Sequence, residues 1–263
     1  MYIIKVGGGS TINLEGVVSD LTTLDQPFLV VLGANALRDD LGLRLGQKKV
    51  ELTSVSGYSS VFSDADAIDL IMMAYSGLSN RRFVEMCQRE GVNALGLTGL
   101  DGRLVQGRRN RGIKVRENGK TMIKRDFSGK PAKVNAALLT TLLDQGYRPV
   151  LSIPIIDETG FAINSENDDI VAVLQEALKA DKVIQLIEAP GFLEDKNDEG
   201  SMLQTLSASE IKAREASVEG RMKRKMLALG RLFDAGAHEV IISDGRTVHP
   251  VLDALAGKGT TIR

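Results

Sequence analysis

Short apolar runs alternate with longer stretches of helical periodicity along the whole chain. The apolar runs occupy residues 2–4, 28–32, 94–97, 149–154, 182–187 and 238–242, and a last strand is expected near Thr260. The helical stretches cover residues 13–24, 37–45, 64–77, 80–90, 132–146, 170–180, 217–235 and 250–256. An uninterrupted apolar run is typical of a strand buried on both faces. The alternation predicts an α/β fold, a three-layer αβα sandwich with a central, mostly parallel sheet.

No sharp linker divides the chain. We expect one domain over residues 1–263, with two lobes, 1–148 and 149–263, that share the sheet. The apolar side of the helix at 64–77, from Ile68 to Tyr75, fits either the core or a contact with a second copy. Residues 48–58 are expected to form a short hairpin or a loop.

The composition excludes several classes of protein. The net charge is −1 and aromatic residues make up 4%, so the whole chain does not suit nucleic-acid binding. The chain has two histidines, His238 and His249, which argues against a zinc cluster or a Ser-His-Asp triad. Cys87 is the single cysteine, which precludes an internal disulfide and fits a reducing cytoplasm. No signal peptide or membrane-length apolar run is present, so no membrane is expected as a partner.

Glycine-rich turns follow the first two apolar runs. The first reads Lys5-Val6-Gly7-Gly8-Gly9, and Asn13 is a suitable N-cap for the helix that follows. Successive glycines can present bare N–H groups to an anion, and a strand, a glycine nest and a helix start together make a phosphate cradle. The pattern is neither the Rossmann fingerprint nor the P-loop. Taken locally, it fits a simple glycine turn beside a surface lysine equally well.

Polar residues crowd the start of the helix at 170–180. N-capping explains Asn167 or Asp168, but it does not require Asn164, Asn167, Asp168 and Asp169 together. This cluster is therefore a candidate site.

A basic segment interrupts the near-neutral chain. Residues 103–125 hold nine lysines and arginines against one acid, Glu117. The segment 117–120 contains Asn-Gly, the strongest signal for a hairpin turn. A solvated surface would explain such a run, but the imbalance favours a projecting basic β-hairpin that docks an acidic partner.

These segments together resemble the amino-acid kinase family and its acetylglutamate kinase branch. The matching segments, which span essentially the whole chain, are Lys5–Gly8, Gly33-Ala34, Asn164 with Asp168, Lys225 after residues 220–222, and 243–246 with 257–260. Within that branch the chain is most similar to the [LysW]-aminoadipate and [LysW]-glutamate kinases. The segments that carry this similarity are 96–104, 107–109, 117–120 and 220–225. Substrates of that subfamily hang from the C-terminus of a small acidic carrier protein.

The resemblance implies a carbamate kinase-like fold and a reaction. The γ-phosphoryl of ATP, with Mg²⁺ bridging the phosphates, would pass to the side-chain carboxylate of an N-blocked acidic amino acid in lysine or arginine biosynthesis. It further implies a cytoplasmic homodimer, with substrate in lobe 1–148 and ATP in lobe 149–263. The implied catalytic residues are Lys5, Lys225 and Asp168, and the implied substrate-binding residues are Gly33, Ala34 and Asn164. The implied nucleotide-binding residues are Gly7, Gly8, Glu188, Gly191 and Phe192. The implied carrier-docking residues are Arg108, Arg109, Arg111, Lys114 and Arg116.

Three positions depart from the family pattern. The second turn reads Leu32-Gly33-Ala34 where the family has His-Gly-Gly, and a left-handed backbone at Ala34 would be costly. Val61 stands where the family has an arginine for the substrate's α-carboxylate, and Glu188 stands where a serine or threonine is usual. Three hypotheses remain: a kinase of a carrier-linked acid, a kinase of free N-acetylglutamate, and an altered relative that binds a ligand or protein.

Overall fold

The computed structural model describes the chain except for residues 48, 56–58, 118–119, 196 and 218–219. An eight-stranded sheet forms its centre, in the order β16-β18-β17-β13-β1-β2-β10-β5. Neighbouring strands are parallel except for β17 and β18, which are antiparallel. The strands are β1 Tyr2–Val6, β2 Phe28–Leu32, β5 Ala94–Thr98, β10 Arg148–Ser152, β13 Lys182–Ile187, β16 Thr205–Leu206, β17 Val240–Asp244 and β18 Thr260–Ile262.

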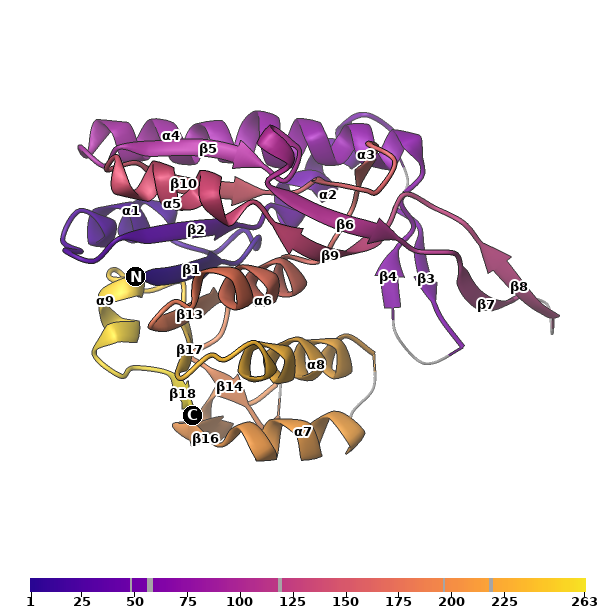
Figure 1. Ribbon diagram of the computed structural model, residues 1–263. Helices are drawn as coiled ribbons and strands as arrows, with labels where there is room; N and C mark the ends of the chain where they lie inside the picture. The colour runs from indigo at the N-terminus through magenta and orange to yellow at the C-terminus, as the bar shows by residue number, and fades with distance from the viewer. Residues whose placement is uncertain (48, 56–58, 118–119, 196, 218–219) are drawn as a thin grey trace.

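Helices cover both faces of this sheet (Figure 1). Successive strand residues point to opposite faces, so Ile3 belongs to one apolar cluster and Ile4 to the other. The first cluster packs under α3, α5, α6 and α8, and the second packs under α1, α4 and α9. The prediction of a three-layer sandwich with a mostly parallel sheet is confirmed. The helices are α1 Leu14–Leu21, α2 Asn35–Arg44, α3 Ala65–Ile71, α4 Asn80–Arg89, α5 Ala136–Asp144, α6 Asn167–Leu178, α7 Ala208–Ser217, α8 Gly220–Asp234 and α9 Pro250–Leu255.

The order of strands mixes the two halves of the chain. β10 begins at Arg148, where the boundary between lobes was expected, and lies between β2 and β5 of the first half. β1 lies between β2 and β13, so the two halves meet along β1 and β13.

A continuous helical rod extends from α3 through a π-helix, Met72–Ser79, into α4. The sequence predicts the two flanking helices but not the π-helix between them. Ile68, Ile71, Ala74 and Tyr75 lie in the core, so core burial accounts for the apolar side from Ile68 to Tyr75.

Smaller sheets project beyond the ends of the central strands (Figure 1). One has the order β12-β11-β6-β9, and the hairpins β3–β4 and β7–β8 lie beyond it. These strands are β3 Glu51–Thr53, β4 Ser59–Val61, β6 Val105–Arg109, β7 Ile113–Glu117, β8 Lys120–Lys124, β9 Gly129–Val134, β11 Ile155–Ile156 and β12 Ala162–Ile163. Both expected hairpins are present, although turn residues 118–119 and residues 48 and 56–58 lie outside the described residues. The pair β14 Phe192–Leu193 and β15 Met202–Leu203 and the 3₁₀ turns Asp101–Arg103 and Glu199–Ser201 complete the fold.

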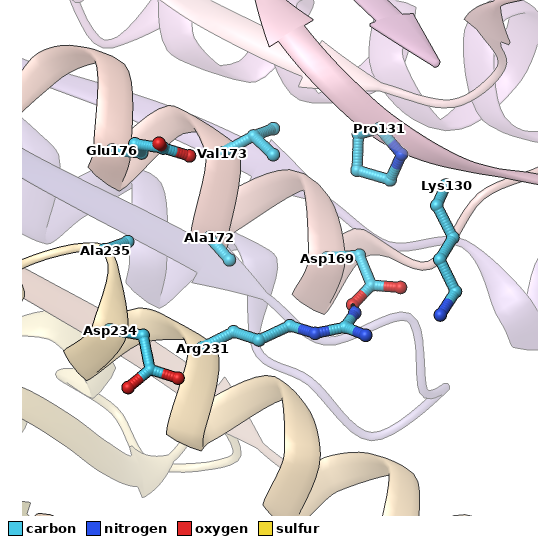
Figure 2. A pocket seen from close by; sticks show the side chains of 9 residues that line it. All are labelled: Lys130, Pro131, Asp169, Ala172, Val173, Glu176, Arg231, Asp234 and Ala235. Carbon is cyan, nitrogen blue, oxygen red and sulfur yellow. Dashed lines mark hydrogen bonds and ion pairs between the residues drawn. The ribbon is translucent and has the colours of Figure 1, made fainter. Parts of the chain in front are cut away.

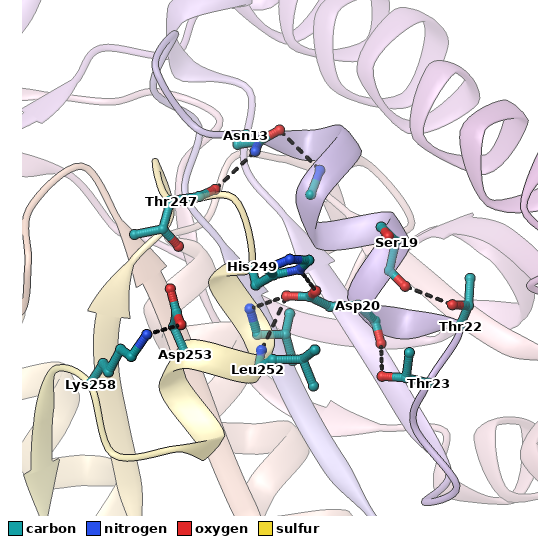
Figure 3. A network of polar contacts seen from close by, with 12 residues as sticks. Asn13, Ser19, Asp20, Thr22, Thr23, Thr247, His249, Leu252, Asp253 and Lys258 are labelled. Atoms are coloured by element: carbon teal, nitrogen blue, oxygen red, sulfur yellow. Dashed lines mark hydrogen bonds and ion pairs between the residues drawn. The ribbon is translucent and has the colours of Figure 1, made fainter.

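A buried polar network fixes α1 against α9 (Figure 3). Asp20 is 1% exposed and accepts hydrogen bonds from the backbone N–H groups of Val251 and Leu252, while His249 Nδ1 lies 2.9 Å from its carboxylate. Asn13 caps α1, as predicted, by accepting from the Gly16 N–H, and it donates to the Thr247 carbonyl. Buried carboxylates need such partners, so this network anchors the helix that follows the first glycine turn.

No helix within the described residues is both long and apolar enough to cross a lipid bilayer.

Candidate functional site

The two glycine turns touch each other at the ends of β1 and β2. A Cβ on Gly8 would lie 2.5 Å from the backbone nitrogens of Ala34 and Asn35, and one on Gly33 would lie 2.6 Å from the Gly8 nitrogen. Only glycine permits so close an approach of two backbones. Ala34 has a φ of −151° and a buried methyl group, so the departure from glycine costs no backbone strain there.

The available backbone donors differ from those expected. The Gly7 N–H donates to the Leu186 carbonyl at 2.9 Å, and the Gly33 N–H donates to the Val6 carbonyl at 2.9 Å. Among the described residues, the N–H groups of Gly8, Gly9 and Ser10 have no such acceptor. Gly8 thus remains a candidate anion donor, while Gly7 and Gly33 shape the turns.

Lys5 and Asp168 meet beside these turns. Lys5 is the fourth residue of β1, Asp168 is in the first turn of α6, and their side chains form an ion pair. The two side chains are 13% and 23% exposed, so the pair lies at the surface of the site rather than deep in the core. Asn167 donates to the Leu32 carbonyl at 3.3 Å and so holds the start of α6 against the end of β2. The positive end of the α6 dipole adds to the attraction for an anion at this edge.

The neighbouring acid, Asp169, faces another helix. It forms an ion pair with Arg231 of α8, and both residues line a cleft of about 360 Å³ (Figure 2). Lys225 is an exposed residue of the same helix α8. Two successive acids of α6 therefore contact β1 on one side and α8 on the other.

Glu188 braces the first glycine turn. Its Oε1 accepts from the backbone N–H of Thr11 at 3.0 Å and from the Thr11 hydroxyl at 2.6 Å. These bonds hold the pKa of the Glu188 carboxyl below its usual value of 4.5. A Cβ on Gly9 would lie 1.9 Å from that carboxyl group, so a side chain at position 9 would displace the Glu188 carboxylate. Glu188 thus supports the turn, and its binding of the nucleotide stays a prediction. Its partner Thr11 was missed because no local pattern links positions so far apart.

Gly191 and Phe192 follow the end of β13. The Phe192 N–H donates to the Thr260 hydroxyl at 2.8 Å, and the Arg214 guanidinium lies 5.8 Å from the centre of the Phe192 ring. A Cβ on Gly191 would lie 2.6 Å from the same Thr260 hydroxyl oxygen. Gly191 and Phe192, at the start of β14, therefore lie between β18 and α7.

Asn164 directly follows β12 of the small sheet. Its side-chain amide donates to the Ser63 hydroxyl at 3.0 Å, and its carbonyl accepts from Gly129. Ser63 in turn donates its N–H to the buried Asp126. Asn164 thus joins the segment before α3 to the start of β9.

Tyr75 is a site residue that the sequence did not single out. The π-helix brings its hydroxyl to Asn35, directly after the second glycine turn. Burial raises the pKa of Tyr75 to about 12, so the phenol stays a hydrogen-bond donor at neutral pH. A π-helix is often found at functional sites.

The five expected docking residues fall into two groups. Arg108, Arg111, Lys114 and Arg116 are exposed, and the last two lie on β7 of the projecting hairpin. Arg109 instead lies 3.8 Å over the Phe127 ring and donates to the Asp126 carbonyl, so it stabilises the base of the hairpin. The opposite strand β8 adds exposed Met122 and Ile123.

Cys87 lies in the core, and burial raises the pKa of its thiol to about 12. It is therefore a small apolar core residue and not a nucleophile.

The chain is similar to known kinases over most of its length. The amino acid kinase family matches residues 1–244, so the chain belongs to the amino acid kinase family and is a phosphotransferase. A [LysW]-aminoadipate kinase of Thermus thermophilus is 38% identical, with 100% of both chains covered. An acetylglutamate kinase of Methanopyrus kandleri is 30% identical, again with both chains fully covered. Among solved structures, an N-acetylglutamate synthase of Neisseria gonorrhoeae has the same fold with a TM-score of 0.79 at 20% identity, over 99% of this chain and 58% of that longer one.

Proposed function

We propose that the protein phosphorylates the side-chain carboxylate of an acidic amino acid that is carried on a small acidic protein, using ATP and giving an acyl phosphate for lysine biosynthesis. The Lys5–Asp168 ion pair beside the open amides of Gly8, Gly9 and Ser10 is the observation that carries this proposal. The full-length similarity to a [LysW]-aminoadipate kinase supports the choice of substrate.

Catalysis by these residues is electrostatic. The attacking carboxylate is already ionised at neutral pH, so no general base is needed. One of its oxygens forms a bond to the γ-phosphorus while the bond to the ADP oxygen breaks, and ADP leaves. Lys5 and the Gly8 amide would neutralise charge on the transferring phosphoryl group, and Lys225 would neutralise the leaving phosphate. Asp168 would hold the two lysines in register, because two cations directed at one site repel each other without an anion between them.

Mg²⁺ is proposed to enter with the nucleotide. Within the described part of the chain, no group of three or more histidine, cysteine or acidic side chains could hold a metal ion. Mg²⁺ is commonly held by ATP phosphates and water with few protein ligands, so it does not require such a group of side chains. When bound, the ion would supply further neutralisation of the phosphate charge.

The projecting hairpin is proposed as the carrier-docking surface. Lys114 and Arg116 give it positive charge, and Ile123, which pairs with Lys114 across the hairpin, adds an exposed apolar side chain on the same face. A free acetylated amino acid would need neither feature. Val61, in place of an arginine, further weakens the case for free N-acetylglutamate, although an acetylglutamate kinase is among the relatives.

The remaining features of the proposal concern the whole protein. Substrate is assigned to lobe 1–148, ATP to lobe 149–263, and the chain to a cytoplasmic homodimer. Met73 and Leu78 are exposed on the π-helix and are the candidate contact between copies. Light scattering tests this point, with a monomer as the contradicting result.

An ATP-dependent hydroxamate assay separates the hypotheses. Carrier-linked aminoadipate, free acetylaminoadipate and free acetylglutamate are compared, and hydroxylamine traps the acyl phosphate. We expect turnover of the carrier-linked acid, with a rate that falls at high salt for that substrate alone, because salt screens the docking charges. Folded protein that gives no hydroxamate with any of the three would contradict the proposal.

A further inference from the structure

The Asp169–Arg231 ion pair lies outside the proposed catalytic set but directly beside it. Asp169 follows Asp168 in the first turn of α6, and its side chain is 15% exposed. Arg231 lies in the last part of α8, and its side chain is 33% exposed. Figure 2 shows Arg231 extending from α8 across the cleft until its guanidinium meets Asp169. Partial exclusion of water strengthens such a pair relative to one on the open surface.

The two neighbouring acids connect three elements. Successive side chains of a helix point about 100° apart, so neighbouring residues in one turn of α6 can contact two different elements. Asp168 binds Lys5 of β1, and Asp169 binds Arg231 of α8. The start of α6 is itself fixed to the end of β2 through Asn167. The first turn of α6, which holds Lys5, therefore also holds α8 in place.

Lys225 lies on this same helix. It precedes Arg231 by six residues, which corresponds to about 9 Å along a helix axis. Long helical side chains lean toward the N-terminus of their helix, so the Arg231 guanidinium reaches toward the part of α8 that carries Lys225. A shift of α8 against α6 would move Lys225 relative to Lys5 by a similar amount.

We propose that the Asp169–Arg231 pair is a positioning device that sets the place of the Lys225 helix relative to the Lys5–Asp168 pair. This inference rests on the proposed function, because it takes Lys225 as a group that acts on the leaving phosphate. Arg231 and Asp169 do not touch the reacting atoms and act only through α8.

The test compares Arg231→Ala, Asp169→Asn and Arg231→Lys with a matched control. The control is Lys212→Ala. It removes a different ion pair of α8, between Asp234 of α8 and Lys212 of α7, whose side chains are 62% and 59% exposed. We expect kcat to fall by about 10- to 100-fold in Arg231→Ala and Asp169→Asn, because misplacement by about 1 Å has such an effect. KM for ATP should change far less than kcat, Arg231→Lys should be intermediate, and the control should match the wild type. The exchanged pair Asp169→Arg with Arg231→Asp should recover part of the lost kcat.

Hydrogen exchange gives a readout that does not depend on turnover. We expect the backbone amides of residues 223–230 to exchange faster in Arg231→Ala than in Lys212→Ala, with unfolding temperatures of the two variants close together. Unchanged exchange in this segment would overturn the inference even if the enzyme is active. Equal kcat values for Arg231→Ala and the control would also overturn it. An inactive wild-type protein with faster exchange in Arg231→Ala would instead contradict the proposed function and leave the positioning of α8 supported.

Discussion

Single side chains brace the site as much as they form it. Glu188 shows this best, because its carboxylate accepts two hydrogen bonds from Thr11 and lies against Gly9. The family resemblance places Glu188 near the nucleotide, but the bracing role follows only from the folded contact. Lys5 and Asp168 are different, because the resemblance suggested their proximity and the structure shows them in contact.

Replacing Glu188 by Gln should make stability less dependent on pH. The folded pKa of Glu188 lies below its usual value of 4.5, so its contribution to stability is present above about that pH and is lost as the pH falls through the lower folded value. Urea unfolding of the wild type and Glu188→Gln checks this at neutral and acid pH. We expect a stability difference near pH 7 that shrinks below about pH 4.5. A difference that stays constant over this range would count against the brace.

Elements were predictable where burial dominates the sequence. Six strands of the central sheet coincide with apolar runs, because a parallel strand covered on both faces is mainly apolar. β16, with two residues, and α7, with weak helical periodicity, were not predicted. The π-helix was also missed, because its residues carry the same apolar pattern as an ordinary helix.

The two glycine turns give a prediction for a single element. Gly8→Ala should disrupt the contact between the turns, since its Cβ would lie 2.5 Å from backbone nitrogen, and backbone cannot give way cheaply. We expect loss of ATP binding and a fall of the unfolding free energy by about 1–3 kcal/mol. Gly230→Ala in α8 is the control: its Cβ would meet only Lys212 Cγ at 4.0 Å, so it should stabilise the protein by about 0.5–1 kcal/mol. Calorimetry distinguishes the two, and a neutral Gly8→Ala would refute the packing account.

The β7–β8 hairpin gives a second prediction at this scale. Reversing Lys114 and Arg116 to Glu should raise KM for the carrier-linked substrate by about tenfold or more, because association is steered by charge. The kcat at saturation and all kinetics with free substrate should stay unchanged. The charge-matched control is the double reversal of Arg82 and Arg89 to Glu on α4, which changes the same number of charges away from the hairpin. An equal effect of the control, or none from the hairpin variant, would remove the hairpin from the docking surface.

At the scale of the whole molecule, the site is made where distant segments meet. β1 and β13 join the halves of the chain, and α6 contacts β1 and α8 together. The alternation of elements predicted the layers, but not the order of strands, because insertion of β10 between β2 and β5 depends on long-range pairing. For the same reason the sequence could not indicate that Asp169 would meet Arg231, or that Tyr75 would meet Asn35.

The most direct measurement is kcat for acyl phosphate formation by Lys5→Ala, Lys225→Ala and the double variant. Each single change should lower kcat by about 10²–10³-fold, since each removes a cation from one developing charge. The double variant should lose much less than the product of the two, because groups that act as a unit are not additive. Lys182→Ala, which breaks the Lys182–Glu239 ion pair at the start of β13, should keep near-normal kcat. A folded Lys5→Ala enzyme with wild-type kcat, or losses that multiply fully in the double variant, would contradict two lysines acting on one phosphoryl group.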